Sequence, residues 1–205
     1  MEKGLVLLSG GQDSTTCLYW ALNKFNYVES VGFYYGQRHS GELAQAAKIA
    51  EMCGIKHTVK YMANVLTVDK ESFYRITWGR NILFLTVAAS LAKHLNINNL
   101  IMGASQADQD EYPDCRPEFL SVMEAALSSG LGFNINIHTP LIKSNKAETW
   151  KMAKDLNCLD VIINHTLTDY NGNTDMNEWG MGKLDNHASE ERAKGFYEAK
   201  KLNWI

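Results

Sequence analysis

The sequence has little that would bind nucleic acid or enter a membrane. Its longest basic run is Lys200-Lys201, the formal net charge is −3 and the pI is about 6.1. A nucleic-acid surface needs clustered lysine and arginine to neutralise phosphates, so we expect no nucleic-acid partner. No apolar run approaches the roughly 18 residues of a membrane span, and no signal peptide is recognisable before Leu5. We therefore expect a soluble, cytoplasmic protein with no membrane contact.

Cysteine is scarce and widely spaced. Cys17, Cys53, Cys115 and Cys158 form no CxxC pair, which excludes a zinc ribbon and a thioredoxin-type motif. Four reduced thiols suit a cytosolic protein. A chain of 205 residues buries roughly 70% of its unfolded surface on folding, so it needs neither disulfides nor a metal for stability.

Apolar strands alternate with helices along most of the chain. Strands are expected at 5–8, 28–35, 57–61, 99–102 and 135–138, and helices at 15–24, 40–52, 80–95, 118–127 and 144–156, the last capped by Ser144. This alternation predicts an α/β fold with a doubly wound, mostly parallel sheet that helices cover on both faces. The composition of the sequence changes near residue 165, and residues 169–187 are rich in glycine and asparagine. We expect residues 1–165 to form the α/β domain and residues 166–205 a C-terminal appendage, with a loop at 169–187 and a helix at 188–201.

The first strand runs into a short segment that has the properties of a phosphate-binding loop. Two adjacent glycines let the backbone approach a ligand, and the next helix directs its positive end at the same place. The expected nucleotide-binding residues are Leu8, Ser9, Gly10, Gly11, Gln12, Asp13 and Ser14. The loop is not a Walker loop, because GxxxxGK[ST] is absent. A plain turn before a capped helix is the alternative, which the preceding strand and Asp13-Ser14 disfavour.

SGGxDS directly after a first strand resembles the pyrophosphate loop of the N-type ATP pyrophosphatases. Within that group, the chain resembles the 7-cyano-7-deazaguanine synthase family. The matching segments, in the family's order, are Ser9 to Cys17, Tyr35 to His39, Gly79-Arg80-Asn81, Tyr112 to Arg116, His138 to Leu141 and Lys146 to Trp150. The resemblance implies an ATP-dependent carbon–nitrogen ligase of queuosine biosynthesis. Such an enzyme uses ATP, Mg²⁺ and ammonia to convert 7-carboxy-7-deazaguanine to the amide and then to the nitrile. The resemblance also implies a homodimer.

Adenylation of a carboxylate places negative charge on phosphoryl oxygens, which cations and loop amides would stabilise. The candidate catalytic cations are Arg80, Arg38 and Lys146, each of which has a plainer interpretation as a surface charge. Asp13 is the candidate Mg²⁺ ligand, since a hard cation takes oxygen ligands. The candidate substrate-binding residues are Tyr35, Gln37, His39, Asp108, Tyr112, Asp114 and Arg116.

Several of these assignments keep an alternative. Asp108 or Asp114 would accept hydrogen bonds from a purine-like ring, or would belong to a polar loop with a Tyr-Pro turn. His39 is either structural or a proton shuttle, and Cys115 is equally a small packed residue, since no base is evident beside it.

The tail departs from the family, which binds structural zinc through four cysteines there. The corresponding positions hold Asp169, Met181, Leu184 and His187. Leucine cannot bind zinc and a methionine thioether binds it poorly, so we expect no zinc. We expect Trp179, Met181 and Leu184 to form an apolar plug in its place.

A second departure is the segment between Met62 and Thr77, which is shorter than the family's insertion. Such segments often close over substrates, so the sequence leaves open whether the product is the amide or the nitrile. Two rival functions are a degenerate nucleotide-binding module and a related pyrophosphatase that acts on tRNA or another carboxylate. The intact loop and Arg80 disfavour the first, and the acidic charge balance disfavours action on tRNA.

Overall fold

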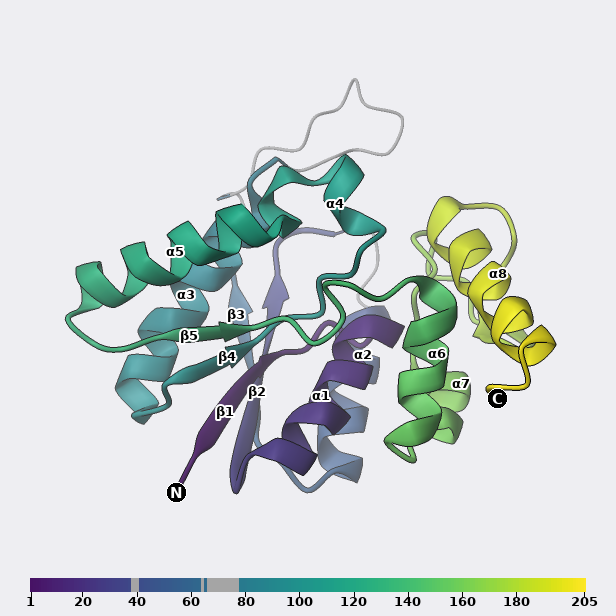
Figure 1. The fold of residues 1–205 in the computed structure, drawn as a ribbon, viewed down its shortest axis with the longest axis horizontal. Coiled ribbons are helices and arrows are strands. Elements are labelled where there is room, and N and C mark those ends of the chain that lie inside the picture. The colour runs from purple at the N-terminus through teal and green to yellow at the C-terminus, as the bar shows by residue number, and fades with distance from the viewer. Residues whose placement is uncertain (38–40, 64, 66–77) are drawn as a thin grey trace.

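A computed structural model describes residues 1–37, 41–63, 65 and 78–205. Its centre is a five-stranded, fully parallel sheet with the strand order β3-β2-β1-β4-β5 (Figure 1). The strands are β1 (Lys3–Leu7), β2 (Tyr27–Tyr34), β3 (His57–Tyr61), β4 (Asn99–Ile101) and β5 (Asn136–His138). The expected doubly wound α/β fold is confirmed. The strand order reverses between β1 and β4, and ligands of open α/β sheets bind at the carboxyl ends of the strands at such a reversal.

Helices cover both faces of the sheet. They are α1 (Gln12–Lys24), α2 (Gly41–Met52), α3 (Arg80–Leu95), the short α4 (Asp108–Glu111) and 3-10 turn η1 (Pro113–Cys115), α5 (Pro117–Leu131), α6 (Lys146–Asp155), α7 (Leu159–His165) and α8 (His187–Lys201). Figure 1 shows α3 and α5 on one face, and α1 and α2 on the other. Side chains alternate along a strand, so Leu5 joins the core under α3 and α5, whereas Val6 joins the core under α1 and α2.

A third apolar cluster holds the tail against the rest of the molecule. It combines Trp150 of α6 and Ile162 of α7 with Trp179 and Phe196 of the tail. The contact is tight, because a Cβ added at Gly195 of α8 would lie 2.6 Å from the Lys146 Cβ. The cluster crosses residue 165, and the division of the chain into a domain and an appendage stays a prediction.

The structure corrects several expected boundaries. Helix α6 begins at Lys146 and is capped by Asn145, not by Ser144. The Asn145 side chain accepts a hydrogen bond from the Glu148 amide at 2.9 Å, and the Glu148 carboxylate accepts one from the Asn145 amide at 2.9 Å. This capping box satisfies two N–H groups that a Ser144 cap would leave open, and the Ser144 amide bonds Leu141 in the preceding turn.

Other elements were not expected. Helix α1 begins at Gln12, three residues earlier than predicted, and α4 and α7 were missed. The tail loop contains a small antiparallel pair, β6 (Met176–Asn177) and β7 (Gly180–Met181). Among the described residues, no helix combines the length and apolar character that crossing a membrane would require.

Candidate active site

Hydrogen bonds among its own polar groups hold the loop after β1 in a tight turn. The Ser9 amide donates to the Ser14 hydroxyl at 3.2 Å, and the two hydroxyl oxygens lie 2.9 Å apart. Gly10 has a φ of +92°, and a Cβ there would lie 2.2 Å from the Glu42 carbonyl oxygen. Only glycine fits this position, because α2 begins directly against it. Helix α1 starts immediately after Gly11, so its positive N-terminal end meets the loop.

A cavity of about 320 Å³ lies against this loop, at the point where the strand order reverses. The predicted site residues that line it are Leu8, Ser9, Gly11, Gln12, Asp13, Ser14, Tyr35, Gln37, Arg80, Asp108 and Tyr112. They come from the ends of β1 and β2, the start of α3 and the segment after β4. Residues far apart in the sequence therefore converge on one concave, polar site.

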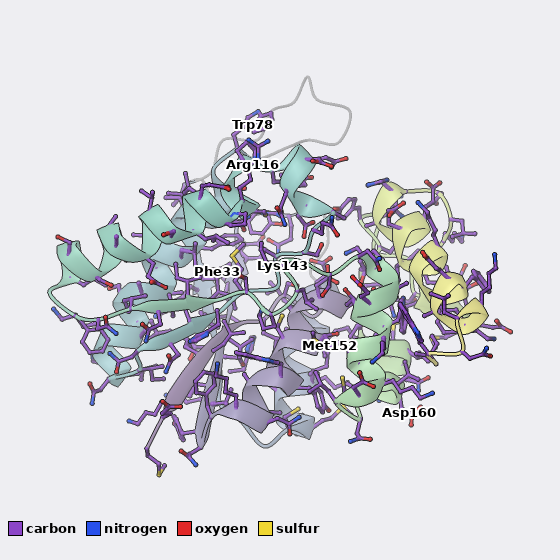
Figure 2. The ribbon with its side chains drawn as sticks, viewed as in Figure 1. Phe33, Trp78, Arg116, Lys143, Met152 and Asp160 are labelled. Carbon is purple, nitrogen blue, oxygen red and sulfur yellow. The ribbon has the colours of Figure 1, made fainter. Side chains whose placement is uncertain are left out.

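Other predicted site residues lie elsewhere. Gly10 belongs to the loop but faces α2, and it does not line the cavity. The buried Asp114 carboxylate accepts a hydrogen bond from the Asn81 amide at 2.9 Å, so it fixes the first turn of α3. Arg116 is exposed, and its Nε donates to the Gln109 carbonyl at 2.9 Å. Figure 2 shows Arg116 near the edge of the molecule and Phe33, which lines the cavity, near its centre.

Two further candidates, Arg38 and His39, lie outside the described residues. Cys115 lines the cavity, but burial raises the pKa of its thiol to about 12, and its sulfur accepts a hydrogen bond from the Asn81 side chain. Such a thiol is not a nucleophile at neutral pH. The interpretation of Cys115 as a small packed residue fits this environment.

Arg80 is held by aromatic groups. Its Nη1 donates to the Tyr35 hydroxyl at 3.2 Å, and its guanidinium carbon lies 5.7 Å from the Tyr35 ring centroid and 6.0 Å from that of Phe84. These contacts orient the cation toward the cavity without neutralising it, since tyrosine and phenylalanine carry no charge at neutral pH. Arg80 can therefore offer its full positive charge to an anionic ligand.

Asp13 and Lys146 form an ion pair at the cavity. Lys146 Nζ lies 2.7 Å from Asp13 Oδ2, and both side chains are largely buried. Burial would lower the pKa of Lys146, but the carboxylates of Asp13 and Asp108 outweigh it and raise the pKa. Lys146 does not itself line the cavity and reaches it through Asp13.

Two side chains in the loop have buried polar atoms without a hydrogen-bond partner among the described residues. The atoms are Asp13 Oδ1 and both amide atoms of Gln12. Asp13 lines the cavity, and its carboxylate fits Mg²⁺, which is usually held by one or two carboxylates together with substrate phosphates. Asp13 is therefore the residue that would hold the ion.

The cavity wall also contains residues that sequence reasoning did not assign to the site, among them Glu42, Phe84, Thr168 and Tyr170. Burial raises the pKa of Glu42 to about 7; the charge of Asp169 adds to this rise and that of Arg80 opposes it. Glu42 closely follows the Tyr35 to His39 segment and could have been found there. Thr168 and Tyr170 gave no such signal, because only the tertiary fold brings the tail to the loop.

The tail does not have the expected apolar plug. Trp179 is buried at 2% exposure, but Leu184 is 61% exposed, so the predicted cluster with Met181 is wrong for Leu184. Polar contacts hold this loop instead, and they centre on the buried Asp169 carboxylate. Burial would raise the pKa of Asp169, but hydrogen bonds from backbone amides and from Ser189 outweigh it and hold the pKa below its usual range.

The residues at the family's zinc positions do not fit a zinc ion. Leu184 has no donor atom, and the His187 ring lies 3.8 Å from the Glu111 carboxylate. Across the described part of the chain, no three histidine, cysteine or acidic side chains are grouped in a way that could hold a metal. A closed tetrahedral site needs four suitable ligands.

The sheet order and the SGGxDS loop at the end of β1 define an adenine nucleotide alpha hydrolase-like protein, the class of the PP-loop ATPases. The fold is similar to a 4-thiouridine synthetase in complex with RNA and bound ATP, with a TM-score of 0.58, 17% identity and coverage of 98% of this chain and 52% of that chain. It is also similar to a predicted subunit of tRNA methyltransferase from Methanocaldococcus jannaschii, with a TM-score of 0.50, 19% identity and coverage of 98% and 89%.

The family model for queuosine biosynthesis protein QueC matches residues 3–200, and the chain belongs to this family. A 7-cyano-7-deazaguanine synthase of Clostridium acetobutylicum is 39% identical over 218 residues, covering 98% of this chain and 96% of the relative. One of Bacillus subtilis is 43% identical over 186 residues, covering 83% and 85%. The expected family is confirmed.

Proposed function

We propose that the protein uses ATP to adenylate the carboxylate of 7-carboxy-7-deazaguanine and then amidates it with ammonia. The first product is 7-amido-7-deazaguanine, and a second adenylation would give the 7-cyano compound that names the curated relatives. The observation that carries the proposal is the convergence of the SGGxDS loop, Asp13 and Arg80 on one cavity. ATP and Mg²⁺ are the cofactors proposed, with no zinc.

In the first step, a carboxylate oxygen of the substrate attacks the α-phosphorus of ATP and pyrophosphate leaves. The backbone amides of the loop and the N-terminal end of α1 bind the phosphates. Arg80 offsets the negative charge that develops on the phosphoryl oxygens. Mg²⁺ held by Asp13 would neutralise phosphate charge at the same place.

In the second step, ammonia attacks the activated carbonyl carbon, the bond from that carbon to the phosphate oxygen breaks, and AMP leaves. The nitrogen loses a proton and the amide remains. For the nitrile, the amide oxygen attacks a second ATP, pyrophosphate leaves, and AMP is then expelled as the nitrogen loses its last two protons. Each stage consumes one ATP, and the same phosphate site serves both.

The aromatic wall of the cavity suits a flat, purine-like ring. Tyr35, Phe84 and Tyr112 contribute rings to it. Asp108 lies on the same wall and is oriented by the Ser105 amide and hydroxyl, which donate to its Oδ2 at 2.8 Å and 2.7 Å. Its other oxygen can accept hydrogen bonds from the ring N–H and the exocyclic amine of the substrate.

The test is to incubate the purified protein with ATP, Mg²⁺, ammonium and 7-carboxy-7-deazaguanine and to follow the products over time by mass spectrometry. We expect AMP, pyrophosphate and the 7-amide. Later conversion of the amide to the nitrile would define a full synthase, and an amide that persists would define an amide synthase. Absence of both deazaguanine products and of AMP would refute the proposal. A parallel reaction with tRNA tests the related tRNA-directed activity, and sedimentation velocity tests the homodimer.

A further inference from the structure

The Asp169 carboxylate is the centre of a hydrogen-bond network in the tail. Its Oδ1 accepts from the Asn171 amide at 2.7 Å and the Asn173 amide at 3.3 Å. Its Oδ2 accepts from the Lys183 amide at 2.9 Å and from two side chains, Asn186 Nδ2 at 3.0 Å and Ser189 Oγ at 2.9 Å. One side chain thus joins both arms of the loop to the start of α8.

This network holds a carboxylate that is fully buried, with 0% of Asp169 exposed. Within the described residues, no lysine, arginine or histidine forms an ion pair with it. A buried charge is tolerated only where hydrogen bonds replace its hydration, and here five donors do so. The arrangement requires an ionised acid, because a neutral side chain offers fewer acceptor sites to the same donors.

The residues beside Asp169 are bonded to the phosphate loop. The Leu167 amide donates to the Gly10 carbonyl at 3.0 Å, and the Gln12 amide donates to the Thr168 hydroxyl at 3.2 Å. On the other side of Asp169, Tyr170 lines the cavity. Asp169 therefore lies in the middle of a strip of chain that forms one wall of the nucleotide cavity.

A buried arginine also forms hydrogen bonds with this segment of the tail. Arg192 is 0% exposed and donates from Nη1 to the Thr168 hydroxyl at 3.1 Å and to the Thr166 carbonyl at 3.3 Å. It also donates to the Trp179 carbonyl at 2.9 Å and the Ile162 carbonyl at 2.8 Å. The Thr168 hydroxyl thus lies between a fixed guanidinium and the Gln12 amide at the start of α1.

We propose that Asp169 is a positioning residue whose carboxylate organises the tail in place of a metal ion and, through Thr168, sets the geometry of the phosphate loop. The four side chains at the family's metal positions cannot form a closed site, whereas the first of them already receives five hydrogen bonds. An ionised acid with matched donors does here what a metal would otherwise do: it fixes two arms of a loop and a helix start to one point.

The decisive variant is Asp169→Asn, which keeps the shape of the side chain. Whichever way the amide turns, its NH₂ group faces backbone amides that need an acceptor, namely those of Asn171 and Asn173 on one side or that of Lys183 on the other. The matched control is Asp175→Asn in the same loop, because the Asp175 side chain is exposed and, among the residues the structure describes, its carboxylate pairs only with Lys183, at 3.4 Å. Ser189→Ala removes one donor, keeps the carboxylate and serves if Asp169→Asn fails to fold.

The first measurement is amide hydrogen exchange of the full-length chain without ligand. In Asp169→Asn, we expect faster exchange in the peptides that cover residues 166–186 and 8–14, and unchanged exchange in β3. Ser189→Ala should show the same pattern with a smaller change, and Asp175→Asn should match the wild type. Unchanged exchange at residues 8–14 in both test variants would overturn the link to the loop, and a uniform increase that includes β3 would reduce Asp169 to a general stabiliser.

The second measurement is binding of α,β-methylene-ATP with Mg²⁺ by calorimetry, with zinc counted in the wild type by elemental analysis. We expect the Kd to rise about tenfold in Asp169→Asn and to stay unchanged in Asp175→Asn. Stoichiometric zinc whose removal by EDTA loosens the tail would overturn the proposal. The nucleotide measurement rests on the proposed function, whereas the exchange experiment needs no ligand. A wild type that binds no nucleotide would therefore refute the function and leave the positioning role to be judged by exchange.

Discussion

Lys146 at the start of α6 donates to the carboxylate of Asp13 in the phosphate loop, with 2.7 Å between Nζ and Oδ2. The sequence separates the two residues by 133 positions. The other oxygen of Asp13, Oδ1, is buried and has no hydrogen-bond partner among the described residues. Lys146 therefore sets both the position and the orientation of the acid that would hold Mg²⁺.

Replacing Lys146 with methionine should leave Asp13 partly buried and unpaired. We expect a loss of roughly 1.5–3 kcal/mol in unfolding free energy, the usual contribution of a hydrogen bond to a charged group. We also expect a larger Mg²⁺ requirement for activity, because Asp13 is no longer held in place. Denaturant unfolding and a Mg²⁺ titration of AMP formation measure the two effects. Lys143→Met is the control, since Lys143 is exposed, and equal effects of both substitutions would contradict the prediction.

Arg80 should contribute mainly to the chemical step. Arg80→Ala removes a cation from the cavity wall, and loss of one such group commonly reduces kcat by roughly 10²–10³-fold. Arg80→Lys keeps a charge but lacks the planar fork of donors, so we expect an intermediate rate. Initial-rate kinetics of AMP release provide the measurement, with the exposed Lys154→Ala as a surface-cation control. A wild-type kcat for Arg80→Ala would remove Arg80 from the mechanism.

Gly10 should tolerate no side chain. Gly10→Ala places a Cβ 2.2 Å from the Glu42 carbonyl oxygen and 2.8 Å from the Ala46 amide nitrogen. Gly54→Ala is the matched control, because Gly54 also has a positive φ, +65°, but no atom within 4 Å of its added Cβ. Both substitutions carry the left-handed backbone penalty of roughly 1–2 kcal/mol. The extra loss of stability in Gly10→Ala, measured by denaturant unfolding, reports the contact with α2, and equal losses would argue against it.

Glu42 should make both stability and nucleotide binding depend on pH. Its pKa is raised from 4.5 to about 7, so the folded protein holds a proton that the unfolded chain has lost. The stability that this proton contributes is complete below pH 4.5, declines as the pH rises through 7 and is absent above it. Glu42 also lines the cavity, so the negative charge that appears above pH 7 should weaken the binding of a nucleotide's phosphates there.

The variant Glu42→Gln separates these effects from other titrations. It stays neutral, so its unfolding free energy should lose less than that of the wild type between pH 5 and pH 8. Its affinity for α,β-methylene-ATP should likewise fall less over the same range. The titration of the nucleotide itself is common to both proteins and cancels in the comparison. Parallel pH profiles for the two proteins would show that Glu42 does not titrate in this window.

The sequence predicted the sheet and the phosphate loop because both depend on local patterns. β3 and α3 have the predicted bounds, and the loop residues lie where a strand meets a helix. Such signals come from apolar periodicity and glycine placement, which act within a few residues. Helix α7 was missed because its seven residues are too few to show a clear helical periodicity.

The rest of the site depended on contacts that no local pattern encodes. Thr168 and Tyr170 reach the cavity only because the tail packs on α6 and α7. The loss of the family's cysteines was visible in the sequence, but the compensating role of Asp169 was not. An aspartate in a polar loop is ordinary, and only the fold shows five donors converging on it. For the same reason, Asp114 and Arg116 were assigned to the substrate. In the structure, Asp114 instead bonds the first turn of α3, and Arg116 lies at the surface.

The bond between Thr168 and the Gln12 amide also bears on the order in which the protein matures during synthesis. Every strand of the five-stranded sheet is complete once residue 138 has left the ribosome. The wall of the cavity that contains Thr168 is completed only by Arg192, which is synthesised more than fifty residues later. A growing chain therefore acquires its sheet well before the cavity is finished, and the cavity cannot take its final geometry until residue 192 has been synthesised.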